Sequence, residues 1–323
     1  MPKPPSNGVR RRRDPSEDAT TTSATDKVAD AVKAVEDKAS QTLLILWDEL
    51  EDWRRDNAFI LGGYRRTSNS YAASLASLLH LHNESVNIWT HLVGAVGFTA
   101  TGAYFLQAVV RPRVAEAYGG DVLAFACFFA GAFLCLGMSA TFHTLSNHSP
   151  AVAKWGNKLD YTGIVFLIVG SYVPALYYGF RCHPALLELY LSMICILGLG
   201  CLAVSWVDHF RSPAWRPYRA LMFVGLGLSG VVPVMHAIGE DGFAALDQRM
   251  GLRWVLLQGG MYIFGAFIYA ARWPERSFPG KFDIWCSSHQ IFHVFVLLAA
   301  ASHLYGMIKA FDFRHSPMGS AQC

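Results

Sequence analysis

The sequence has little charge. Only 16% of its 323 residues are Asp, Glu, Lys or Arg, whereas these residues make up about a quarter of an ordinary soluble domain. Hydrophobic residues make up 53% of the chain. This balance is typical of a protein whose solvent is a lipid bilayer, and the formal net charge of +3 is too small to indicate nucleic acid as a partner.

Three further patterns are missing. The first 40 residues contain no apolar run, so we expect no cleaved secretory signal and expect the first spanning helix to direct insertion. The seven cysteines are scattered singly without a CxxC pair, and we interpret them as small apolar residues rather than as disulfide or thiolate groups. No internal repeat is visible, which disfavours an inverted-repeat transporter.

Long apolar stretches are present instead. A membrane-spanning helix needs about 20 mostly apolar residues, and the stretches that meet this need are residues 86–110, 122–142, 160–180, 186–207, 217–237, 253–271 and 285–308. They predict an all-α membrane protein in which a seven-transmembrane helix bundle occupies residues 86–310.

The flanking segments are polar. Residues 1–26 combine Pro, Ser, Thr and four consecutive arginines, and their composition predicts a disordered tail. Residues 27–85 mix apolar and charged positions with partly helical spacing, so we expect a cytoplasmic amphipathic helical region on the bundle or the lipid headgroups. Residues 311–323 are expected to form a short C-terminal tail.

The distribution of basic residues predicts the orientation. More lysines and arginines flank the spans on the face of the N-terminus than on the opposite face, and such residues favour the cytoplasm. The N-terminus should therefore be cytoplasmic and the C-terminus outside, in the plasma membrane or the endoplasmic reticulum. The sequons that begin at Asn83 and Asn147 lie on the N-terminal face, so neither should carry a glycan.

Three histidines lie at the ends of apolar stretches, where ionisable groups are rare and usually functional. His143 ends the second stretch, and His289 and His293 lie near the start of the seventh. The end of an even-numbered helix and the start of an odd-numbered one lie on the same membrane face. Ser139 and Asp160 belong to that face as well, so all of these side chains can converge.

The spacing of these residues indicates a metal. His289 and His293 are four residues apart, which places both imidazoles on one side of a helix. With His143 they form a three-histidine set that favours zinc and leaves its fourth position for water, as catalytic sites do. Asp160 would balance the ion's charge and hold the water or orient a histidine, and Ser139 would add a hydrogen bond. The alternative is that the histidine pair is only interfacial.

Other polar residues have simpler interpretations. His82, Glu84 and His91 are possible metal ligands at the entrance of the first span, but a polar helix start that satisfies backbone donors is the favoured interpretation. His236 and His303 fall near the far ends of the fifth and seventh spans, and we interpret both as interfacial.

Several ordered motifs carry a family resemblance: HNESVNIWTH at residues 82–91, SATFH at 139–143, KLDYTG at 158–163, PER at 274–276, PGKFDIW at 279–285 and SHQIFH at 288–293. Over about residues 45–310 the chain resembles the adiponectin-receptor family, which also includes progestin and adipoQ receptors and distant haemolysin III relatives. The resemblance implies that His143, His289 and His293 bind zinc, that Asp160 contacts zinc through water, and that the N-terminus is cytoplasmic. Ser139 matches the serine that the family has one turn before its first ligand.

The resemblance also leaves several functions open. Family members look like ceramidases, and fungal members resemble regulators of zinc, lipid and sterol homeostasis. We therefore expect a zinc-dependent hydrolase of ceramide-type amide lipids. The first alternative is a receptor with structural zinc that binds an extracellular protein or lipid. The second is a zinc sensor or transporter, which is weaker because we find no second metal site or acidic path across the bundle.

Overall fold

The computed structural model describes residues 44–107, 119–211 and 213–321. Its α-helices are α2 (Tyr71–Ala76), α3 (Ser85–Phe105), α4 (Gly119–Leu145), α5 (Pro150–Gly179), α6 (Pro184–Trp206), α7 (Arg216–Leu228), α8 (Val231–Asp241), α9 (Phe243–Met250), α10 (Leu252–Ala271), α11 (Ser288–Arg314) and α12 (Pro317–Ser320). One short antiparallel ladder pairs β1 (Leu44–Ile45) with β2 (Tyr64–Arg65). The tail predicted for residues 1–26 lies outside the described residues.

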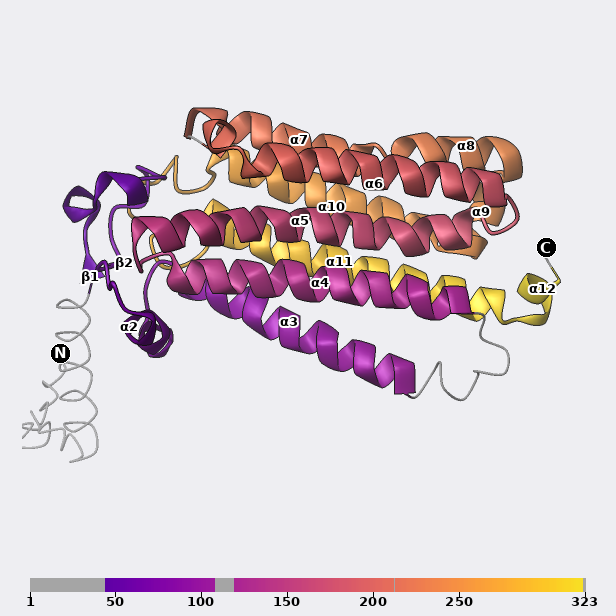
Figure 1. Ribbon diagram of the computed structural model, residues 1–323, viewed down its shortest axis with the longest axis horizontal. Helices are drawn as coiled ribbons and strands as arrows, with labels where there is room; N and C mark the ends of the chain where they lie inside the picture. The colour runs from indigo at the N-terminus through magenta and orange to yellow at the C-terminus, as the bar shows by residue number, and fades with distance from the viewer. Residues whose placement is uncertain (1–43, 108–118, 212, 322–323) are drawn as a thin grey trace, which may run out of the picture. The chain divides into compact units, whose positions relative to one another are not determined.

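The long helices confirm the seven-helix bundle. Among the described residues, six helical segments are long and apolar enough to span a membrane: α4, α5, α6, the continuous stretch of α7 and α8 over Pro217–Asp241, α10 and α11. The seventh is α3, which has 21 residues and packs against α4. Figure 1 shows most of these helices running nearly parallel, with α4, α5 and α11 side by side through the middle and α3 inclined away from α4.

Close packing between α4 and α5 sets the register of the centre of the bundle. A Cβ atom added at Gly163 of α5 would lie 2.8 Å from the Cα of Cys135, and one added at Gly131 of α4 would lie 2.6 Å from the carbonyl oxygen of Phe166. Only glycine permits backbones to approach so closely, and small residues often mark helix contacts in membranes, where hydrophobic driving force between helices is absent. The α4–α5 contact therefore has little freedom to slide.

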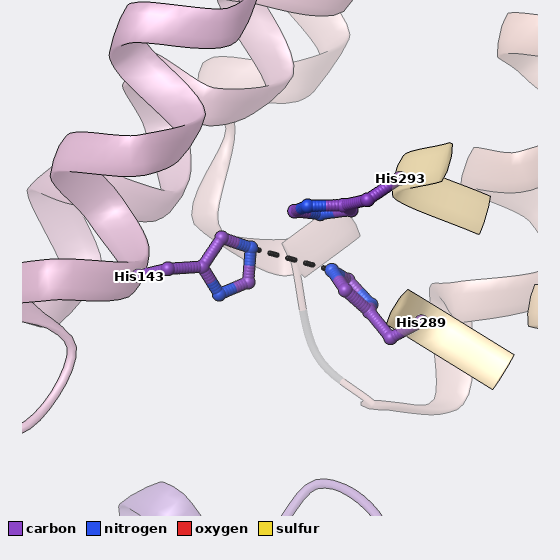
Figure 2. Close-up of side chains that lie close together, drawn as sticks. All are labelled: His143, His289 and His293. Atoms are coloured by element: carbon purple, nitrogen blue, oxygen red, sulfur yellow. Dashed lines mark hydrogen bonds between the residues drawn. The ribbon is translucent and has the colours of Figure 1, made fainter. Parts of the chain in front are cut away.

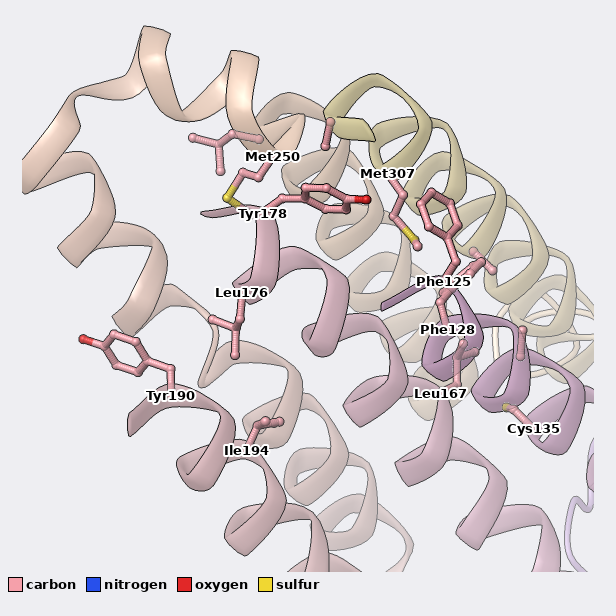
Figure 3. Packing of buried hydrophobic residues seen from close by; sticks show 14 of the residues in the cluster. Phe125, Phe128, Cys135, Leu167, Leu176, Tyr178, Tyr190, Ile194, Met250 and Met307 are labelled. Atoms are coloured by element: carbon pink, nitrogen blue, oxygen red, sulfur yellow. The ribbon is translucent and has the colours of Figure 1, made fainter. Parts of the chain in front are cut away.

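Large side chains fill the bundle beyond this contact. Phe125 and Phe128 of α4, Leu167 of α5 and Met307 of α11 are all buried in one cluster, which Figure 3 shows from close by. Aromatic rings provide part of the packing: the rings of Phe125 and Phe311 meet edge to face with centroids 5.9 Å apart. The core thus joins α4, α5 and α11, the three helices on which the candidate site is built.

Helices α5 and α11 extend beyond their predicted boundaries. Helix α5 begins at Pro150, about ten residues before the predicted start, because Ser149 caps it by accepting a hydrogen bond from the Val152 amide and because proline is favoured in the first helical turn. Asp160 consequently lies within a helix. Helix α11 begins at Ser288 and continues through Arg314, so the tail predicted for residues 311–323 is partly helical.

The segment that precedes the bundle, residues 44–84, is named here the N-terminal cap. The described part of the predicted amphipathic region, residues 44–85, contains the β1–β2 ladder, short 3₁₀ helices and α2, so it is helical only in short pieces. Its apolar residues instead close on one another: Ile45, Leu50, Ile60 and Tyr64 form a small separate core. The cap lies at one end of the bundle, and α12 lies at the other (Figure 1).

One cysteine contradicts the sequence interpretation. Cys182, in the connection between α5 and α6, is disulfide-bonded, whereas Cys127, Cys135, Cys195 and Cys201 are free and lie within helices, as expected of small apolar residues. Disulfides persist mainly in oxidising compartments. A disulfide at the end of the bundle opposite His143 agrees with the predicted cytoplasmic position of the histidine face.

Packing around Asn147 prevents glycosylation of its sequon, in addition to the predicted cytoplasmic orientation. The Asn147 side chain is buried, donates to the Arg66 carbonyl oxygen at 3.0 Å and accepts from the Ser74 hydroxyl at 2.9 Å. The absence of a glycan there would therefore not report the orientation. A free and exposed cysteine, Cys286, offers a better probe because it lies on the histidine face, just before α11.

We expect a membrane-impermeant maleimide to label Cys286 only after cells are permeabilised, because the histidine face is predicted to be cytoplasmic. Cys182 should react in intact cells after treatment with an impermeant reductant. Mass spectrometry of the tagged protein would read out both sites, with Cys286→Ser as the control. Labelling of Cys286 in intact cells would contradict the predicted orientation and place the histidine face outside.

Candidate metal centre

Three imidazoles from two helices meet at the cap end of the bundle. His143 lies in the last turn of α4, and His289 and His293 lie one turn apart near the start of α11 (Figure 2). Their possible ligand atoms all lie within 4.8 Å of one another. His143 and His293 are buried, and His289 is half-buried. The predicted convergence of the three histidines is confirmed.

The separation of the nitrogen atoms fits chelation of one ion. The Nε2 atoms of His143 and His289 lie 3.3 Å apart. Zinc–nitrogen bonds of about 2.0–2.1 Å in tetrahedral geometry place neighbouring donor nitrogens about 3.3–3.4 Å apart. The donor set is also chemically suitable, because imidazole-rich sites with few oxygen ligands favour zinc over magnesium or calcium.

Hydrogen bonds from outside the centre orient two of the rings. The Nδ1 atom of His143 lies 2.8 Å from a carboxylate oxygen of Glu84, and the Nδ1 atom of His293 lies 3.1 Å from the main-chain oxygen of Asn87. Both partners are acceptors, so each ring carries its proton on Nδ1 and directs the Nε2 lone pair inward. Such contacts are the usual support of metal-ligating histidines.

Glu84 has a larger role than the sequence indicated. It immediately precedes α3, where a carboxylate is expected to satisfy helix donors, and it accepts from the Asn87 amide at 2.6 Å. Burial alone would raise the pKa of its carboxyl group, but the contacts with His143 and Asn87 outweigh burial and hold that pKa below the usual range. Glu84 therefore places a negative charge beside the centre, which is what a divalent ion bound by neutral imidazoles requires.

Asp160 lies near the centre but outside the group of converging ligand atoms. Ser139 and His143 are among the polar groups that act on its carboxyl group. Among the described residues, His143, His289 and His293 form the only group of potential ligands whose donor atoms converge closely enough to hold one metal ion. The backbone contact at Gly163, one turn after Asp160, holds α5 against α4 at Cys135, one turn before Ser139. The contact of Asp160 with zinc through water stays a prediction.

The comparisons with known proteins agree with the motifs. The haemolysin-III-related family matches residues 79–304, which is more than half of the chain.

The chain belongs to the haemolysin-III-related family.

Relatives of this haemolysin-III-related protein are found in animals, fungi and plants. It is similar to the adiponectin receptor protein of Drosophila melanogaster, with 45% identity over 83% of this chain and 60% of the fly protein. It is 43% identical to the ADIPOR-like receptor IZH2 of Saccharomyces cerevisiae over 87% of this chain and 89% of the yeast protein. Heptahelical transmembrane protein 1 of Arabidopsis thaliana is 35% identical over 84% of this chain and 82% of the plant protein. The fly protein is thus substantially longer than the matched region.

The remaining histidines of this haemolysin-III-related protein lie outside the ligand group. The ring of His91 stacks on that of His293, with centroids 3.6 Å apart and planes 5° apart. His82 accepts the Glu84 main-chain N–H at its Nδ1 atom, and burial lowers the pKa of His82 to about 3. His236 is partly exposed and bonds to Tyr190. The interfacial prediction for His303 was wrong, because that ring is buried against Phe128 in the interior.

Replacing Glu84 with Gln should weaken zinc binding by roughly 10–100-fold, since the imidazole of His143 would lose a charged acceptor that supports its donor nitrogen. A competition titration of the purified protein with a zinc chelator measures this loss. The control is Glu49→Gln, which alters an exposed carboxylate bonded only to the Leu46 amide among the described residues. Equal zinc affinities of the Glu84 variant and the native protein would show that Glu84 does not support the metal centre.

Proposed function

We propose that this protein is a zinc-dependent intramembrane hydrolase that cleaves the amide bond of ceramide-type lipids. The observation that carries the proposal is the convergence of three imidazoles at one end of the bundle beside a carboxylate that lies outside the ligand group. A centre that only stabilises the fold commonly has four protein ligands, whereas three protein ligands leave one position open for a reacting molecule.

The donor set fits zinc, and His143, His289 and His293 would hold it. When bound at such a site, zinc polarises a carbonyl group and lowers the pKa of water toward neutrality. The protein's own groups would then supply orientation, proton transfer and exclusion of bulk water.

Asp160 would move the proton. As a water molecule attacks the amide carbonyl carbon, Asp160 would accept the water's proton; as the carbon–nitrogen bond breaks, it would return a proton to the departing nitrogen. The products would be a free fatty acid and a sphingoid amine, so atoms and charge balance. Ser139, which is among the groups that act on the Asp160 carboxyl group, would hold it in place by donating a hydrogen bond.

The surroundings of the centre support a lipid substrate. The ring of Phe142 lies 4.9 Å from that of His143, and the ring of Tyr269 lies 5.1 Å from that of His289, measured between centroids. Helices on both sides of the centre are apolar enough to span a bilayer. An amide whose acyl chain enters from the bilayer would keep that chain among apolar side chains and present its carbonyl group at the polar end.

We expect His289→Ala to abolish ceramide hydrolysis together with zinc binding, because it removes one of three ligands. Asp160→Asn should lower turnover by at least 100-fold while zinc remains bound, because the amide keeps the shape of the carboxyl group but cannot accept the proton. Release of fatty acid from ceramide in detergent micelles and metal analysis of the same sample test both statements. Undiminished turnover by the zinc-free His289 variant would refute the hydrolase.

The alternative that the relatives favour is a receptor, since the fly and yeast proteins carry that word in their names. In this alternative, zinc would mainly tie α4 to α11. A transporter is less well supported, because the described residues contain a single group of converging metal ligands.

Chelation distinguishes catalytic from structural zinc. A hydrolase should lose turnover on removal of zinc yet keep most of its thermal stability, because the α4–α5 contact and the buried core remain. A receptor with structural zinc should unfold at a much lower temperature after chelation, as small zinc domains do. Thermal unfolding and turnover measured on one chelated sample, before and after zinc is restored, separate the two cases.

A further inference from the structure

Two charged side chains are buried next to the helix ends that carry the histidines. Arg65 of the N-terminal cap is 4% exposed, and Glu275 of the α10–α11 connection is fully buried. Among the described residues, neither has an oppositely charged side chain within 4.0 Å. A buried charge is costly unless other groups compensate it, so the contacts of each one show what it serves.

Arg65 closes the C-terminal end of α4. Its Nη2 atom donates to the main-chain oxygen of His143 at 2.6 Å, and its Nη1 atom donates to that of Thr144 at 2.8 Å. The same guanidinium donates to the hydroxyl oxygens of Ser77 and Ser146 at 2.8 and 3.1 Å. The last carbonyl groups of a helix lack partners within the helix, and here one of them belongs to a zinc-ligand candidate itself.

Glu275 caps the N-terminal end of α11, where it accepts hydrogen bonds instead of donating them. One carboxylate oxygen accepts the main-chain N–H of Ser288 at 2.8 Å, and the other accepts the Ser288 hydroxyl. Ser288 is the first residue of α11 and directly precedes His289. The carboxylate thus holds the helix one residue before His289, the first of its two candidate ligands.

The signs of the two charges match the helix ends. A helix carries partial negative charge at its C-terminus and partial positive charge at its N-terminus. The cation of Arg65 meets the end of α4, and the anion of Glu275 meets the start of α11, so the helix ends act as the missing counter-charges. Exchange of the two signs would leave both charges uncompensated.

One stretch of the N-terminal cap, Asp56–Arg65, connects these two contacts. The Asn57 amide donates to Glu275 at 3.1 Å, and the Leu61 N–H donates to Asp283 at 2.9 Å. Within the same connection between α10 and α11, the Gly280 N–H donates to the Phe59 carbonyl oxygen at 3.1 Å. The Arg272 guanidinium, just after α10, also donates to the Asp56 carbonyl oxygen at 2.7 Å. This stretch therefore bonds to the end of α4 at Arg65 and to the connection between α10 and α11 through several residues.

We propose that Arg65 and Glu275 are positioning residues that fix the separation of the α4 and α11 ends and thereby set the affinity and geometry of the zinc centre. A metal site must be held within about 0.5 Å of its productive geometry, and these two charges act on the residues that carry or adjoin the ligands. The inference rests on the zinc site of the proposed function, although it does not depend on the reaction catalysed there.

The test uses the full-length purified protein and the variants Arg65→Met and Glu275→Gln, which nearly preserve side-chain size and remove charge. Matched controls are Arg66→Met and Asp48→Asn, which remove exposed charges from the same cap. We expect both test variants to bind zinc roughly 10–100-fold more weakly by chelator competition, and both controls to bind as the native protein does. At saturating cobalt, the visible absorption bands of the test variants should shift, because the donor atoms are less well arranged.

Substitution of a buried charge can prevent folding, so the test includes a milder variant. Asn57→Ala removes the bond from the cap to Glu275 and the local bond from the Phe59 N–H to the Asn57 side chain. We expect it to lower zinc affinity several-fold. Thermal unfolding of the zinc-free proteins provides the comparison: a lower unfolding temperature with native zinc affinity and a native cobalt spectrum would overturn the proposal, since it would show a structural role alone. If the native protein itself binds no zinc at this site, the proposed function fails first and this inference fails with it.

Discussion

Two imidazole nitrogens 3.3 Å apart, on residues separated by 146 positions in the sequence, impose the main constraint on this molecule. If both nitrogens present lone pairs, they repel each other unless a cation or a shared proton lies between them. Outward hydrogen bonds to Glu84 and Asn87 hold His143 and His293 in orientations that favour inward lone pairs. The fold must therefore bring the ends of α4 and α11 together and keep them there.

Two kinds of contact keep these helix ends together: glycine contacts inside the bundle and charged contacts at the helix ends. Gly131 and Gly163 prevent α4 and α5 from sliding past each other, which keeps Asp160 level with Ser139. Arg65 and Glu275 hold the ends of α4 and α11 from outside the bundle. The centre is thus supported by the α4–α5 contact in the apolar interior and by Arg65 and Glu275 at the helix ends. Substitutions can alter these two kinds of support separately.

Much of the bundle and the convergence of the histidines could be predicted from the sequence. Apolar length identifies the spans, and helix parity alone assigns His143, His289 and His293 to one face. The start of α5 could not be predicted in this way, because a serine–proline pair inside a polar stretch can initiate either a loop or a helix. The apolar residues of the N-terminal cap have partly helical spacing, yet they close around a short ladder and turns instead.

The contacts that support the centre were harder to predict. Glu84 has the expected chemistry of a helix start, and only the three-dimensional arrangement shows that its carboxylate also reaches a residue 59 positions away. The interior position of His303 was missed because a histidine late in an apolar stretch suggests an interface. Proximity to the end of a hydrophobic run is a poor guide to depth when the helix continues beyond it, as α11 does to Arg314.

The contacts between the N-terminal cap and the approach to α11 have a consequence for biosynthesis. The ribosome makes Asn57 and Arg65 before any spanning helix, but Asn57 bonds to Glu275, which follows the sixth helix. The cap can acquire all of its partners only after the chain has crossed the membrane six times and α11 has begun. The metal centre is therefore among the last parts of the protein to form, and its completion marks a chain whose helices have all been inserted.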